Sequence, residues 1–580
     1  MNRQEKDIMQ ILLDNANMNQ RMISEMSGHS LGIVNRSINN LIKQGYLNEE
    51  RIPTEKIKCE INNWKPKNAI ILAAGFGMRM IPINKETPKA FLEVKGEILI
   101  ERLIKQLHEA GIRDIYIVVG FMKEKFEYLI DEYGVQLIVN SEYGIKNNLH
   151  SLKLAIEHVS NSYIIPCDVW CAQNPFRVIE SYSWYMVQDT ITTNSPVRVN
   201  RKKELLYSAK TIEGNTMIGI SYLAEKEAKI VRQKINQFSE DPKYDDSFWE
   251  EVLYSEENMI VSARIMSSED VVEINTYEQL RELDHNSKQL ESKAIDVIAQ
   301  TLQASRDEIL DITVLKKGMT NRSFLFTCKN KKYIMRIPGE GTTQLIDRKK
   351  EKEVYQLIGN KNICDHIIYI NPENGYKITE FLENARVCDP ANDDDVKHCM
   401  GKLRELHNLE LEVSHEFDLF DQIEFYEGLW KTEESVFKDY RITKENIFSL
   451  KDYVNRYAGK KVLTHIDAVP DNFLFVKGEI LLIDWEYAGM QDPHVDIAMF
   501  CIYSLFDRKR VDWVIDSYFD NKCDKEIRIK IYCYIAICGL LWSNWCEYKR
   551  NLGVEFGEYS LRQYRYAKDY FKIVKEMLKD

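Results

Sequence analysis

Residues Val462 to Phe475 read VLTHIDAVPDNFLF and decide the fold of the C-terminal half of the chain. Two apolar runs, VLT and FLF, flank a polar loop that carries His465, Asp467 and Asn472 within eight residues. A carboxylate close to an amide can accept a proton from a hydroxyl group and can help to hold a divalent cation. The stretch therefore predicts a catalytic loop set between two buried segments.

Protein kinases place the same residue types at the same spacing, in the pattern H-R-D-x-x-x-x-N. This chain has Ile466 where that pattern has arginine. Twelve residues after Asn472, the run ILLIDWEYAG puts Asp484 where a kinase has its second metal-binding carboxylate. The resemblance implies that Asp467 is the general base, that Asn472 and Asp484 hold magnesium, and that His465 ties the loop to the core.

Segments upstream of the loop predict the nucleotide-binding half of such a fold. YIMRIPG puts Arg336 on a strand where kinases carry a lysine, and the following helix offers Glu351 as an acidic partner. Arginine grips a phosphate with a planar fork, whereas lysine acts as a point charge. GMTNRSF is expected to cover the phosphates, and YKITEF resembles the hinge that holds adenine. The other nucleotide-binding residues predicted here are Gly318, Asn321, Ser323 and Glu380.

The region from about Ile309 to the C-terminus resembles the bacterial choline kinases of the aminoglycoside-phosphotransferase-like superfamily. GMTNRSF, RIPGEGT, ITEF, LRELH, THIDAVPDNFL and IDWEYAG carry the resemblance, which implies ATP and choline as substrates and Mg²⁺ as cofactor. Because quaternary ammonium is recognised by aromatic faces, Trp542, Trp545 and Tyr564 are expected to bind choline. Glu486 is a further predicted substrate residue. For each aromatic residue alone, core packing in a helical bundle is the alternative.

A second nucleotide site is predicted at LAAGFGMRMIP, which begins at the end of the apolar run AIIL. A Rossmann dinucleotide loop would need its third glycine where this chain has Met80, and no Walker P-loop is present. The stretch instead carries the nucleotidyltransferase signature, in which Arg79 and Lys89 offset charge on the phosphates. A simple strand-to-helix turn is the alternative. The predicted nucleotide-binding residues are Leu72, Ala73, Ala74, Gly75 and Gly77.

Residues 68 to 283 resemble the bacterial phosphocholine cytidylyltransferases. NSEYGIKN, NLHSLKLA, DDSFWEEV and VVEINTYEQL also carry this resemblance. It implies CTP and phosphocholine as substrates, Asp168 and Glu273 as Mg²⁺ ligands, and Trp249 as a substrate residue. The family shows D-x-D where this chain has P-C-D ending at Asp168, and an acidic pair where it has E-I-N starting at Glu273. The second metal ligand is therefore left open.

The first 48 residues place apolar side chains at helical spacing in three short runs, with Gly28 in the second turn. MISEMSGHSLGIVNRSINNLIKQGYL resembles the winged helix-turn-helix of bacterial regulators, and DNA is a candidate partner. Residues 1–60 hold eight Lys/Arg and eight Asp/Glu, so no net positive field attracts phosphates. A protein-contact or nucleotide-linked regulatory role is the alternative. The residues expected to read DNA are Asn35, Arg36, Asn39 and Lys43.

The length and composition of the chain limit the number of its domains and the class of protein that it can be. A chain of 580 residues is too long for one core. We expect a multidomain α/β and α+β protein: a winged helix-turn-helix over 1–64, a Rossmann-like nucleotidyltransferase α/β domain with mainly parallel strands over 67–285, and a bilobal protein-kinase-like domain over 290–580.

Twelve cysteines without a CxxC pair predict reduced thiols, and a net charge of -12 argues against a chain built around nucleic acid. The longest apolar run, IYCYIAICGLLW, falls short of the ~20 residues that span a bilayer, so a cytoplasmic location without a membrane partner is expected.

The two predicted sites join as consecutive reactions. The C-terminal domain is expected to phosphorylate choline with ATP, and the middle domain to couple phosphocholine to CTP, giving CDP-choline and pyrophosphate for phosphocholine decoration of surface glycans. Another amino alcohol or 2-aminoethylphosphonate is the alternative substrate. A helix-turn-helix regulator that senses nucleotide or choline is the alternative of a different class.

Overall fold

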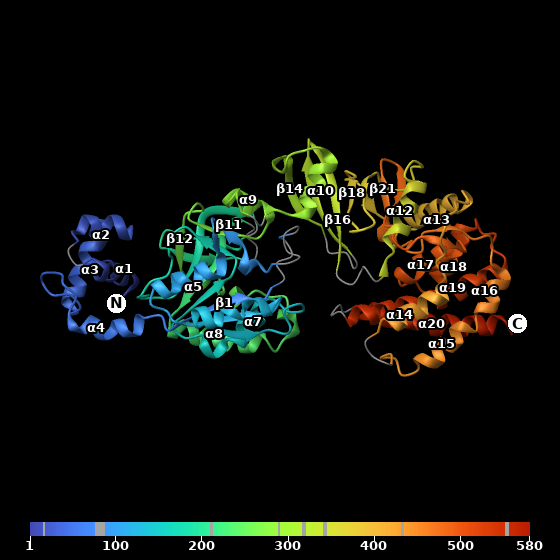
Figure 1. The fold of residues 1–580 in the computed structure, drawn as a ribbon. Helices are drawn as coiled ribbons and strands as arrows, with labels where there is room; N and C mark the ends of the chain where they lie inside the picture. The colour runs from blue at the N-terminus through green and yellow to red at the C-terminus, as the bar shows by residue number, and fades with distance from the viewer. Residues whose placement is uncertain are drawn as a thin grey trace. The chain divides into compact units, whose positions relative to one another are not determined.

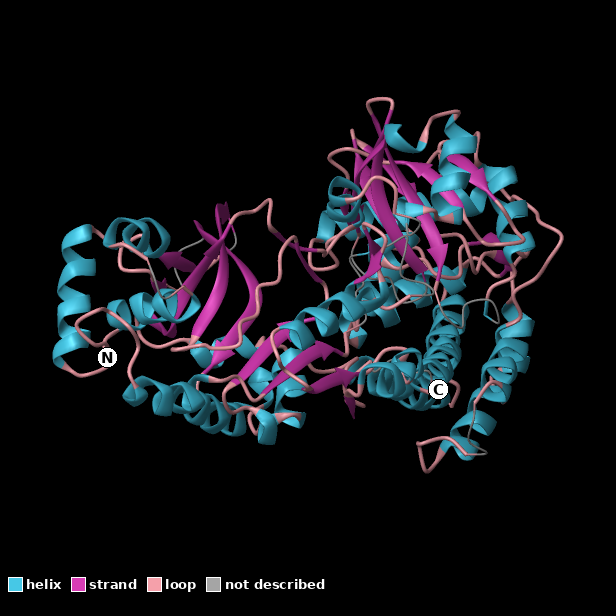
Figure 2. Ribbon diagram, turned by 60° about the vertical axis from the view of Figure 1, so that its left-hand side comes forward, coloured by secondary structure: helices cyan, strands magenta, loops and turns pink. Residues whose placement is uncertain are grey.

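The computed structural model describes residues 1–15, 18–75, 80, 87–193, 195–208, 213–287, 290–315, 321–339, 345–430, 434–551 and 556–579. The chain forms two compact units, Met1–Ser292 and Lys293–Asp580, and each is described by itself (Figures 1 and 2). Three of the predicted site residues, Gly77, Arg79 and Gly318, lie outside the described residues.

The N-terminal unit begins with a helix-turn-helix. Polar caps start each helix: Asn2 for α1, Asn19 for α2 and Ser30 for α3. Gly28 ends α2 in the left-handed conformation with φ of 66°, which a residue without a side chain adopts at little cost. The predicted reader residues on α3 are all exposed, and the predicted wing is a short turn closed by one bridge between Leu47 and Pro53. The helices are α1 (Arg3–Asp14), α2 (Gln20–Ser27), α3 (Leu31–Lys43) and α4 (Glu55–Ile61).

A nine-stranded sheet forms the rest of this unit, in the order β5-β4-β1-β6-β11-β8-β12-β10-β9. The strands β5, β4, β1 and β6 pair in parallel, as predicted. Beyond β6 the pairing is mostly antiparallel, so the predicted mainly parallel sheet is wrong for this half. The reason is that β8 to β11 follow one another without an intervening helix, and parallel neighbours need such a crossover. The strands are β1 (Asn68–Ala73), β4 (Asp114–Val119), β5 (Gln136–Val139), β6 (Ser162–Pro166), β8 (Trp184–Thr193), β9 (Val197–Val199), β10 (Glu204–Tyr207), β11 (Glu213–Leu223) and β12 (Asn258–Met266).

The central strand β1 is buried on both faces. Ile71 lies in the core under α5, whereas Ile70 and Leu72 lie in the core under α7 and α8 (Figure 1). This two-sided burial explains why the strand is a continuous apolar run instead of an alternating one. The remaining elements are β2 (Glu93–Val94), β3 (Glu97–Ile98), β7 (Val169–Cys171), β13 (Val271–Glu273), α5 (Leu99–Glu109), α6 (Tyr128–Tyr133), α7 (Asn148–Leu154), α8 (Glu225–Phe238) and α9 (Tyr277–Leu283).

The C-terminal unit has a β lobe followed by a helical lobe, as predicted. A five-stranded antiparallel sheet has the order β14-β15-β16-β18-β17, and α12 follows β16 in the chain. This lobe contains α10 (Lys293–Leu302), β14 (Ile309–Val314), β15 (Asn321–Cys328), β16 (Lys331–Pro338), α12 (Arg348–Ile358), β17 (Ile367–Ile370) and β18 (Lys377–Glu380).

The helical lobe is built around α19, which packs on α17 and α20. Two short sheets hold the loop that carries the predicted catalytic residues. The elements are β19 (Arg386–Val387), α13 (Asp393–Asn408), α14 (Leu419–Gly428), α15 (Tyr440–Phe448), α16 (Lys451–Tyr457), β20 (Val462–Thr464), β21 (Phe473–Val476), β22 (Glu479–Leu482), β23 (Gly489–Gln491), α17 (His494–Tyr503), α18 (Arg508–Tyr518), α19 (Lys525–Arg550) and α20 (Glu558–Met577).

The apolar run of α19 proves to be part of a longer helix than predicted. With 26 residues and a mean hydropathy of 1.2 in its most apolar window, α19 meets the length and composition of a membrane span. That window is completely buried inside the unit, which is also what the core helix of a globular lobe shows. All twelve cysteines are free thiols, as predicted.

Candidate active sites

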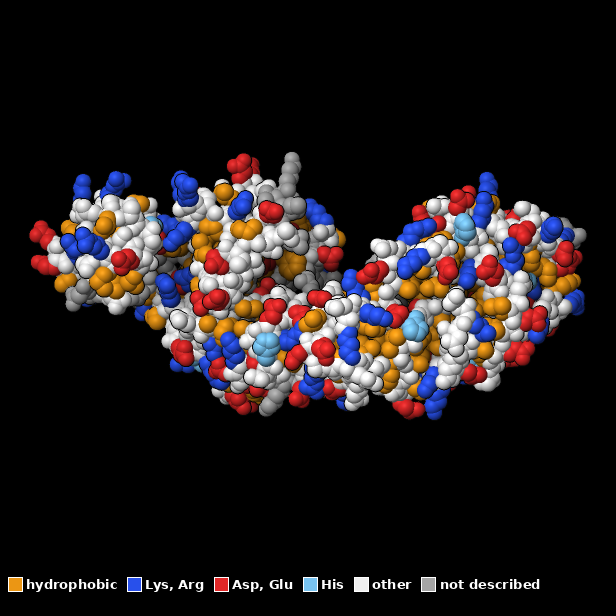
Figure 3. Space-filling model, turned by 90° about the horizontal axis from the view of Figure 1, so that it is seen from above, with side chains coloured by type: hydrophobic (Ala, Val, Ile, Leu, Met, Phe, Trp, Pro, Cys, Tyr) orange, Lys and Arg blue, Asp and Glu red, His pale blue; other side chains and the backbone are white. Residues whose placement is uncertain are grey.

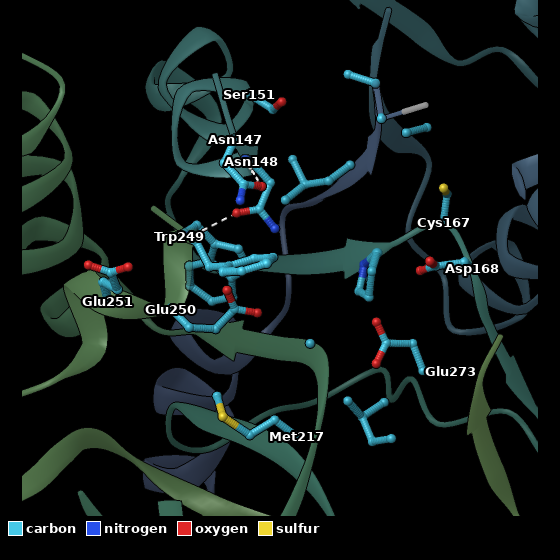
Figure 4. Close-up of a pocket in the computed structure, with 18 of the residues that line it drawn as sticks. Asn147, Asn148, Ser151, Cys167, Asp168, Met217, Trp249, Glu250, Glu251 and Glu273 are labelled. Atoms are coloured by element: carbon cyan, nitrogen blue, oxygen red, sulfur yellow. Dashed lines mark hydrogen bonds between the residues drawn. The ribbon is translucent and has the colours of Figure 1, made fainter. Parts of the chain in front are cut away.

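A cavity of about 1110 Å³ opens in the N-terminal unit at the carboxyl ends of β1 and β6 (Figure 4). Ligands of open α/β sheets bind at this edge. Predicted residues from both ends of the domain line the cavity, together with residues that the sequence did not single out. On the face of the molecule that Figure 3 shows, Lys and Arg side chains are intermixed with Asp and Glu side chains. The lining residues used below are Gly75, Lys89, Asp168, Tyr185, Trp249, Glu250 and Glu273.

One end of the cavity gathers the predicted phosphate and metal residues. Lys89 Nζ donates hydrogen bonds to Asp168 Oδ2 at 2.7 Å and to Asn275 Oδ1 at 2.8 Å. Strand β13 pairs with β7, and the Ile274 amide donates to the Asp168 carbonyl at 2.8 Å, which brings Glu273 beside Asp168. Figure 4 shows these two carboxylates turned toward the same space. This end of the cavity therefore offers a lysine to a phosphate group, and carboxylate and amide oxygens to a cation.

The other end of the cavity is aromatic and holds a buried acid. Tyr185 OH donates to Glu250 Oε1 at 3.1 Å, and Glu250 follows the buried Trp249. The second carboxyl oxygen, Oε2, is buried and accepts no hydrogen bond from the described residues. Burial raises the pKa of Glu250 to about 7. Gly219 faces this end with φ of 85°, and a Cβ there would lie 2.8 Å from Pro166 Cγ, so glycine keeps this wall open.

The sequence reading missed Glu250 and Tyr185. The signal for Glu250 was the acid directly after the predicted Trp249 in FWEEVL. Tyr185 gave no such signal, because it belongs to an apolar strand 65 residues from its partner.

In the part of the chain that the structure describes, no group of three or more His, Cys, Asp and Glu could hold a metal ion by itself. Asp168 and Glu273 still fit Mg²⁺, because this ion is usually held by one or two carboxylates and completes its octahedron with water and phosphate oxygens. Asn275 contributes an amide oxygen that accepts from Lys89 Nζ.

In the C-terminal unit, the loop between β20 and β21 carries Asp467 and Asn472. Asn472 Nδ2 donates to the Asp467 carbonyl at 2.9 Å and to Asp467 Oδ2 at 3.2 Å. Burial, reinforced by the negative charges of Asp484 and Glu486, raises the pKa of Asp467 to about 8. The backbone is left-handed at Ile466 in this loop and at Asp484 after β22, with φ of 67° and 66°. Asn472 thus contacts Asp467, and the charge of Asp484 acts on the same carboxyl group.

His465 contacts the backbone after β22 and Asp496 binds the loop amides, so both connect this loop to the core. His465 Nε2 lies 2.9 Å from the Ile483 carbonyl, and burial lowers the pKa of His465 to about 4, so its ring is neutral. The amides of His465 and Ile466 donate to the two carboxyl oxygens of Asp496 at 3.0 and 2.8 Å. His407 Nε2 lies 3.0 Å from the same carboxylate. The signal for Asp496 was a lone acid in the apolar helix HVDIAMF.

We expect Asp496→Asn to lower the stability of the C-terminal unit by about 1 to 3 kcal/mol, because an amide cannot accept from both loop N–H groups and its NH₂ would face a donor. Phosphoryl transfer should fall with it, whereas cytidylyl transfer should not change. Thermal unfolding and the two activity assays check this. Asp452→Asn, exposed on α16, is the matched control. A variant as stable and active as the wild type would contradict the assigned role.

In the β lobe, the predicted pair of Arg336 and Glu351 is present. Arg336 grips Glu351 with both terminal nitrogens, one of them at 2.9 Å, and also donates to the Gly375 carbonyl at 3.1 Å. Although burial opposes ionisation, the charge of Arg336 lowers the pKa of Glu351 to about 2. Ser323 lies opposite Arg336 on the neighbouring strand, and Glu380 ends β18 at the predicted hinge.

Glu486 is placed differently from its predicted role at the substrate. Its Oε2 accepts from Asn321 Nδ2 at 2.8 Å and from Arg348 Nη1 at 3.1 Å. Arg348 also donates to Glu351 at 2.9 Å, so that Glu486 joins the charge network of the nucleotide side. The direction of the Glu486 side chain depends on its contacts with Asn321 and Arg348, which its position in the sequence does not reveal.

The predicted aromatic trio is only partly brought together. Trp542 and Trp545 meet edge to face at 5.5 Å, and Tyr487 packs against Trp542 at 5.5 Å. Tyr564 instead stacks on Phe437 at 3.9 Å and donates from its hydroxyl to Asp439 at 2.8 Å. Helical spacing put the tryptophans on one face, whereas Tyr564 belongs to another helix whose partners the sequence did not specify.

Comparisons with known proteins follow the same division of the chain. The winged helix-turn-helix DNA-binding family matches residues 1–48, the MobA-like NTP transferase domain residues 69–176, and the choline/ethanolamine kinase family residues 312–535. The choline-phosphate cytidylyltransferase of Streptococcus pneumoniae is 32% identical over 222 residues, which are 37% of this chain and 96% of that protein.

Two further similarities concern the two enzymatic regions. The 2-aminoethylphosphonate cytidylyltransferase of Lancefieldella rimae is 29% identical over 39% of this chain and 94% of its own length. The crystal structure of choline kinase LicA from Streptococcus pneumoniae is 29% identical, covers 48% of this chain and 98% of that chain, and has a TM-score of 0.43.

Proposed function

Because this chain belongs to the choline-phosphate cytidylyltransferase family through its middle region and carries a choline/ethanolamine kinase domain after it, we propose that it converts choline into CDP-choline in two steps. The observation that supports the proposal most is the cavity with a lysine and two carboxylates at one end and an aromatic wall with a buried acid at the other. Such a cavity suits a zwitterion that carries a phosphate and an ammonium group.

In the first step, Asp467 takes the proton of the choline hydroxyl while the oxygen bonds to the γ-phosphorus of ATP and the bond to ADP breaks. A carboxylate with a pKa of about 8 is basic enough to share that proton near neutral pH. Asn472 and Asp484 would hold Mg²⁺, which supplies charge compensation on the phosphates. Arg336, positioned by Glu351, faces the nucleotide side of the same site.

In the second step, a phosphate oxygen of phosphocholine bonds to the α-phosphorus of CTP and the bond to pyrophosphate breaks. No proton has to move, so the protein contributes position and charge. Lys89 offsets the charge that develops on the phosphates, and Asp168 with Glu273 would hold Mg²⁺. Gly75, at the end of β1, lets the backbone approach the nucleotide.

The aromatic end of the cavity would take the ammonium group. Quaternary ammonium cannot donate hydrogen bonds, so the faces of Trp249 and Tyr185 and the charge of Glu250 would attract it. A primary ammonium would instead donate to Glu250 Oε2, which has no described partner. That oxygen favours ethanolamine or 2-aminoethylphosphonate as the second candidate substrate.

The substrate is tested by incubating the purified chain with Mg²⁺, ATP and CTP and one of three acceptors: choline, ethanolamine or 2-aminoethylphosphonate, the last without ATP. We expect CDP-choline to form with the highest kcat/KM. A higher kcat/KM for either primary amine would replace choline with that compound.

The pKa of Glu250 predicts a pH dependence of phosphocholine binding. The folded-state pKa of about 7 lies above the ordinary value for glutamate, so the carboxyl group becomes charged only as the pH rises through 7. We expect the KM for phosphocholine to fall between pH 6 and pH 8, and Glu250→Gln to raise KM about tenfold at pH 8 and much less at pH 6. Since the substrate phosphate titrates equally in both assays, the wild-type to variant ratio isolates Glu250. A constant ratio would contradict this role.

The product CDP-choline suits a later transferase that places phosphocholine on a surface glycan. We also propose that the chain works in the cytoplasm, where ATP and CTP are available, and that the helix-turn-helix binds DNA through Asn35, Arg36, Asn39 and Lys43. Loss of phosphocholine from surface polymers in cells that carry Lys89→Ala would support the first of these assignments.

A further inference from the structure

The helix-turn-helix is joined to the nucleotidyltransferase domain at the turn before its reading helix. Asp7 lies between the two parts: its Oδ1 accepts from Tyr182 OH at 2.7 Å, and its Oδ2 lies 2.9 Å from His29 Nε2. His29 belongs to the turn between α2 and α3, directly before the cap of α3 at Ser30. A shift of Tyr182 would therefore displace Asp7 and His29 and so change the start of α3, the helix that carries the predicted DNA-contacting residues.

A second link reaches the same turn from another segment. Arg3 Nη1 donates to the carbonyls of Lys202 and Lys203 at 3.1 and 3.0 Å. Lys203 Nζ in turn donates to the carbonyl of Ser27, the last residue of α2, at 3.3 Å. Residues 200–203 form the turn of the hairpin between β9 and β10. Two separate segments of the middle domain thus hold the helix-turn-helix turn.

Both segments continue into the wall of the cavity. Tyr182 stands three residues before Tyr185, which lines the cavity and donates to Glu250. The β9–β10 hairpin begins and ends beside Pro196 and Tyr207, which also line the cavity, and Tyr207 stacks on Tyr254 at 4.0 Å. Strand β8 begins at Trp184, two residues after Tyr182, and β9 and β10 run directly into the hairpin turn. A ligand that restrains Tyr185 or Tyr207 would therefore also restrain Tyr182 and residues 200–203.

We propose that occupancy of this cavity controls DNA binding by the helix-turn-helix, so that the chain acts as a regulator that reports on its own product as well as an enzyme. A ligand that orders the cavity wall also orders Tyr182 and the hairpin turn. DNA then binds with a smaller loss of conformational entropy, because the turn is already ordered. The coupling is therefore positive: CDP-choline in the cavity raises the affinity for DNA.

The charge of the N-terminal segment makes such a coupling effective. Eight basic and eight acidic residues within residues 1–60 give it little general attraction to phosphates. The helix-turn-helix therefore lacks a strong electrostatic contribution to DNA binding. A modest change in its affinity for DNA can then decide whether the protein is bound to DNA at a given concentration.

The inference rests on the proposed use of the cavity for CDP-choline. The test uses the full-length chain and the duplex that it enriches from randomised DNA in the presence of CDP-choline. The dissociation constant of that duplex is measured by fluorescence anisotropy with and without saturating CDP-choline. We expect the constant to fall at least about fivefold with CDP-choline, and the duplex to tighten CDP-choline binding by the same factor, as linkage requires.

Tyr182→Phe removes only the hydroxyl that bonds to Asp7 and should weaken the effect of CDP-choline on DNA affinity while leaving cytidylyl transfer unchanged. Tyr222→Phe is the matched control, because its buried hydroxyl has no hydrogen-bond partner among the described residues, and it should keep the coupling. Arg3→Ala tests the second link and should weaken the coupling.

Two outcomes overturn the inference alone while turnover is normal: equal DNA affinity with and without CDP-choline, or full coupling in Tyr182→Phe. Absence of an enriched duplex would overturn the inference together with the proposed DNA binding of the helix-turn-helix. Failure of the wild-type chain to bind or make CDP-choline would contradict the proposed function first, and the inference with it. Turnover measured on the same preparations separates the two cases.

Discussion

Replacing Asp467 with asparagine is expected to lower the rate of ATP-dependent choline phosphorylation by about 10² to 10⁴-fold, the usual contribution of a general base. Asparagine keeps the shape of the side chain and can still accept from Asn472 Nδ2, but it cannot take the hydroxyl proton. Conversion of supplied phosphocholine to CDP-choline should continue at the wild-type rate, because that reaction uses the other unit. Phosphocholine and CDP-choline formation, measured separately, check both statements.

The same substitution should stabilise the C-terminal unit, which provides the folding control. The pKa of Asp467 is about 8 in the folded protein and about 4 in an unfolded chain, so the folded state loses stability as the pH rises from 4 to 8. Asparagine does not ionise, so Asp467→Asn does not lose stability over this pH range. Its stability relative to the wild type should rise above pH 4 and reach its largest excess above pH 8. Asp452→Asn, exposed on α16, should change neither stability nor activity. A lower melting temperature for Asp467→Asn at pH 8 would contradict the unfavourable burial of this charge.

Replacing Lys89 with alanine is expected to have the opposite selectivity. Removing one charged donor from developing phosphate charge costs about 10² to 10³-fold in kcat. The substitution also leaves the Asp168 carboxylate without the hydrogen bond at 2.7 Å. Choline phosphorylation should stay at the wild-type rate. Lys229→Ala, exposed on α8, is the matched control. If Lys89→Ala or Asp467→Asn stopped both half-reactions in a folded protein, the two-site assignment would be wrong.

The sequence predicted best where one short stretch carries the chemistry. His465, Asp467 and Asn472 lie in one loop, so their proximity follows from their spacing in the sequence. Arg336 and Glu351 sit on a strand and the helix after it, 15 residues apart, and their pairing follows from that local arrangement.

Prediction failed where a contact depends on segments far apart in the chain. Asp496 supports the catalytic loop from 30 residues away, and an acid in an apolar helix does not reveal its partners. Glu250 becomes a site residue only because Tyr185 and Gly219 enclose it. The direction of a side chain is also decided by packing, which is why Glu486 turned to Arg348 and Asn321 and away from the predicted substrate position.

Sheet topology shows the same limit. Alternating strands and helices predicted the parallel half around β1 correctly, because each crossover contains a helix. The antiparallel half could have been predicted from the absence of helices between β8 and β11, but the register of those strands is set by tertiary packing. Strand β8 of this half contributes Tyr185 to the aromatic wall of the cavity.

The central claim is that two independent sites act in series and exchange phosphocholine. Mixing purified Asp467→Asn and Lys89→Ala proteins with Mg²⁺, ATP, CTP and choline tests it most directly. Each variant alone should make almost no CDP-choline, and the mixture should restore its formation, since Lys89→Ala supplies phosphocholine to Asp467→Asn. A mixture that remains as inactive as its components, although both proteins are folded, would contradict two separable sites.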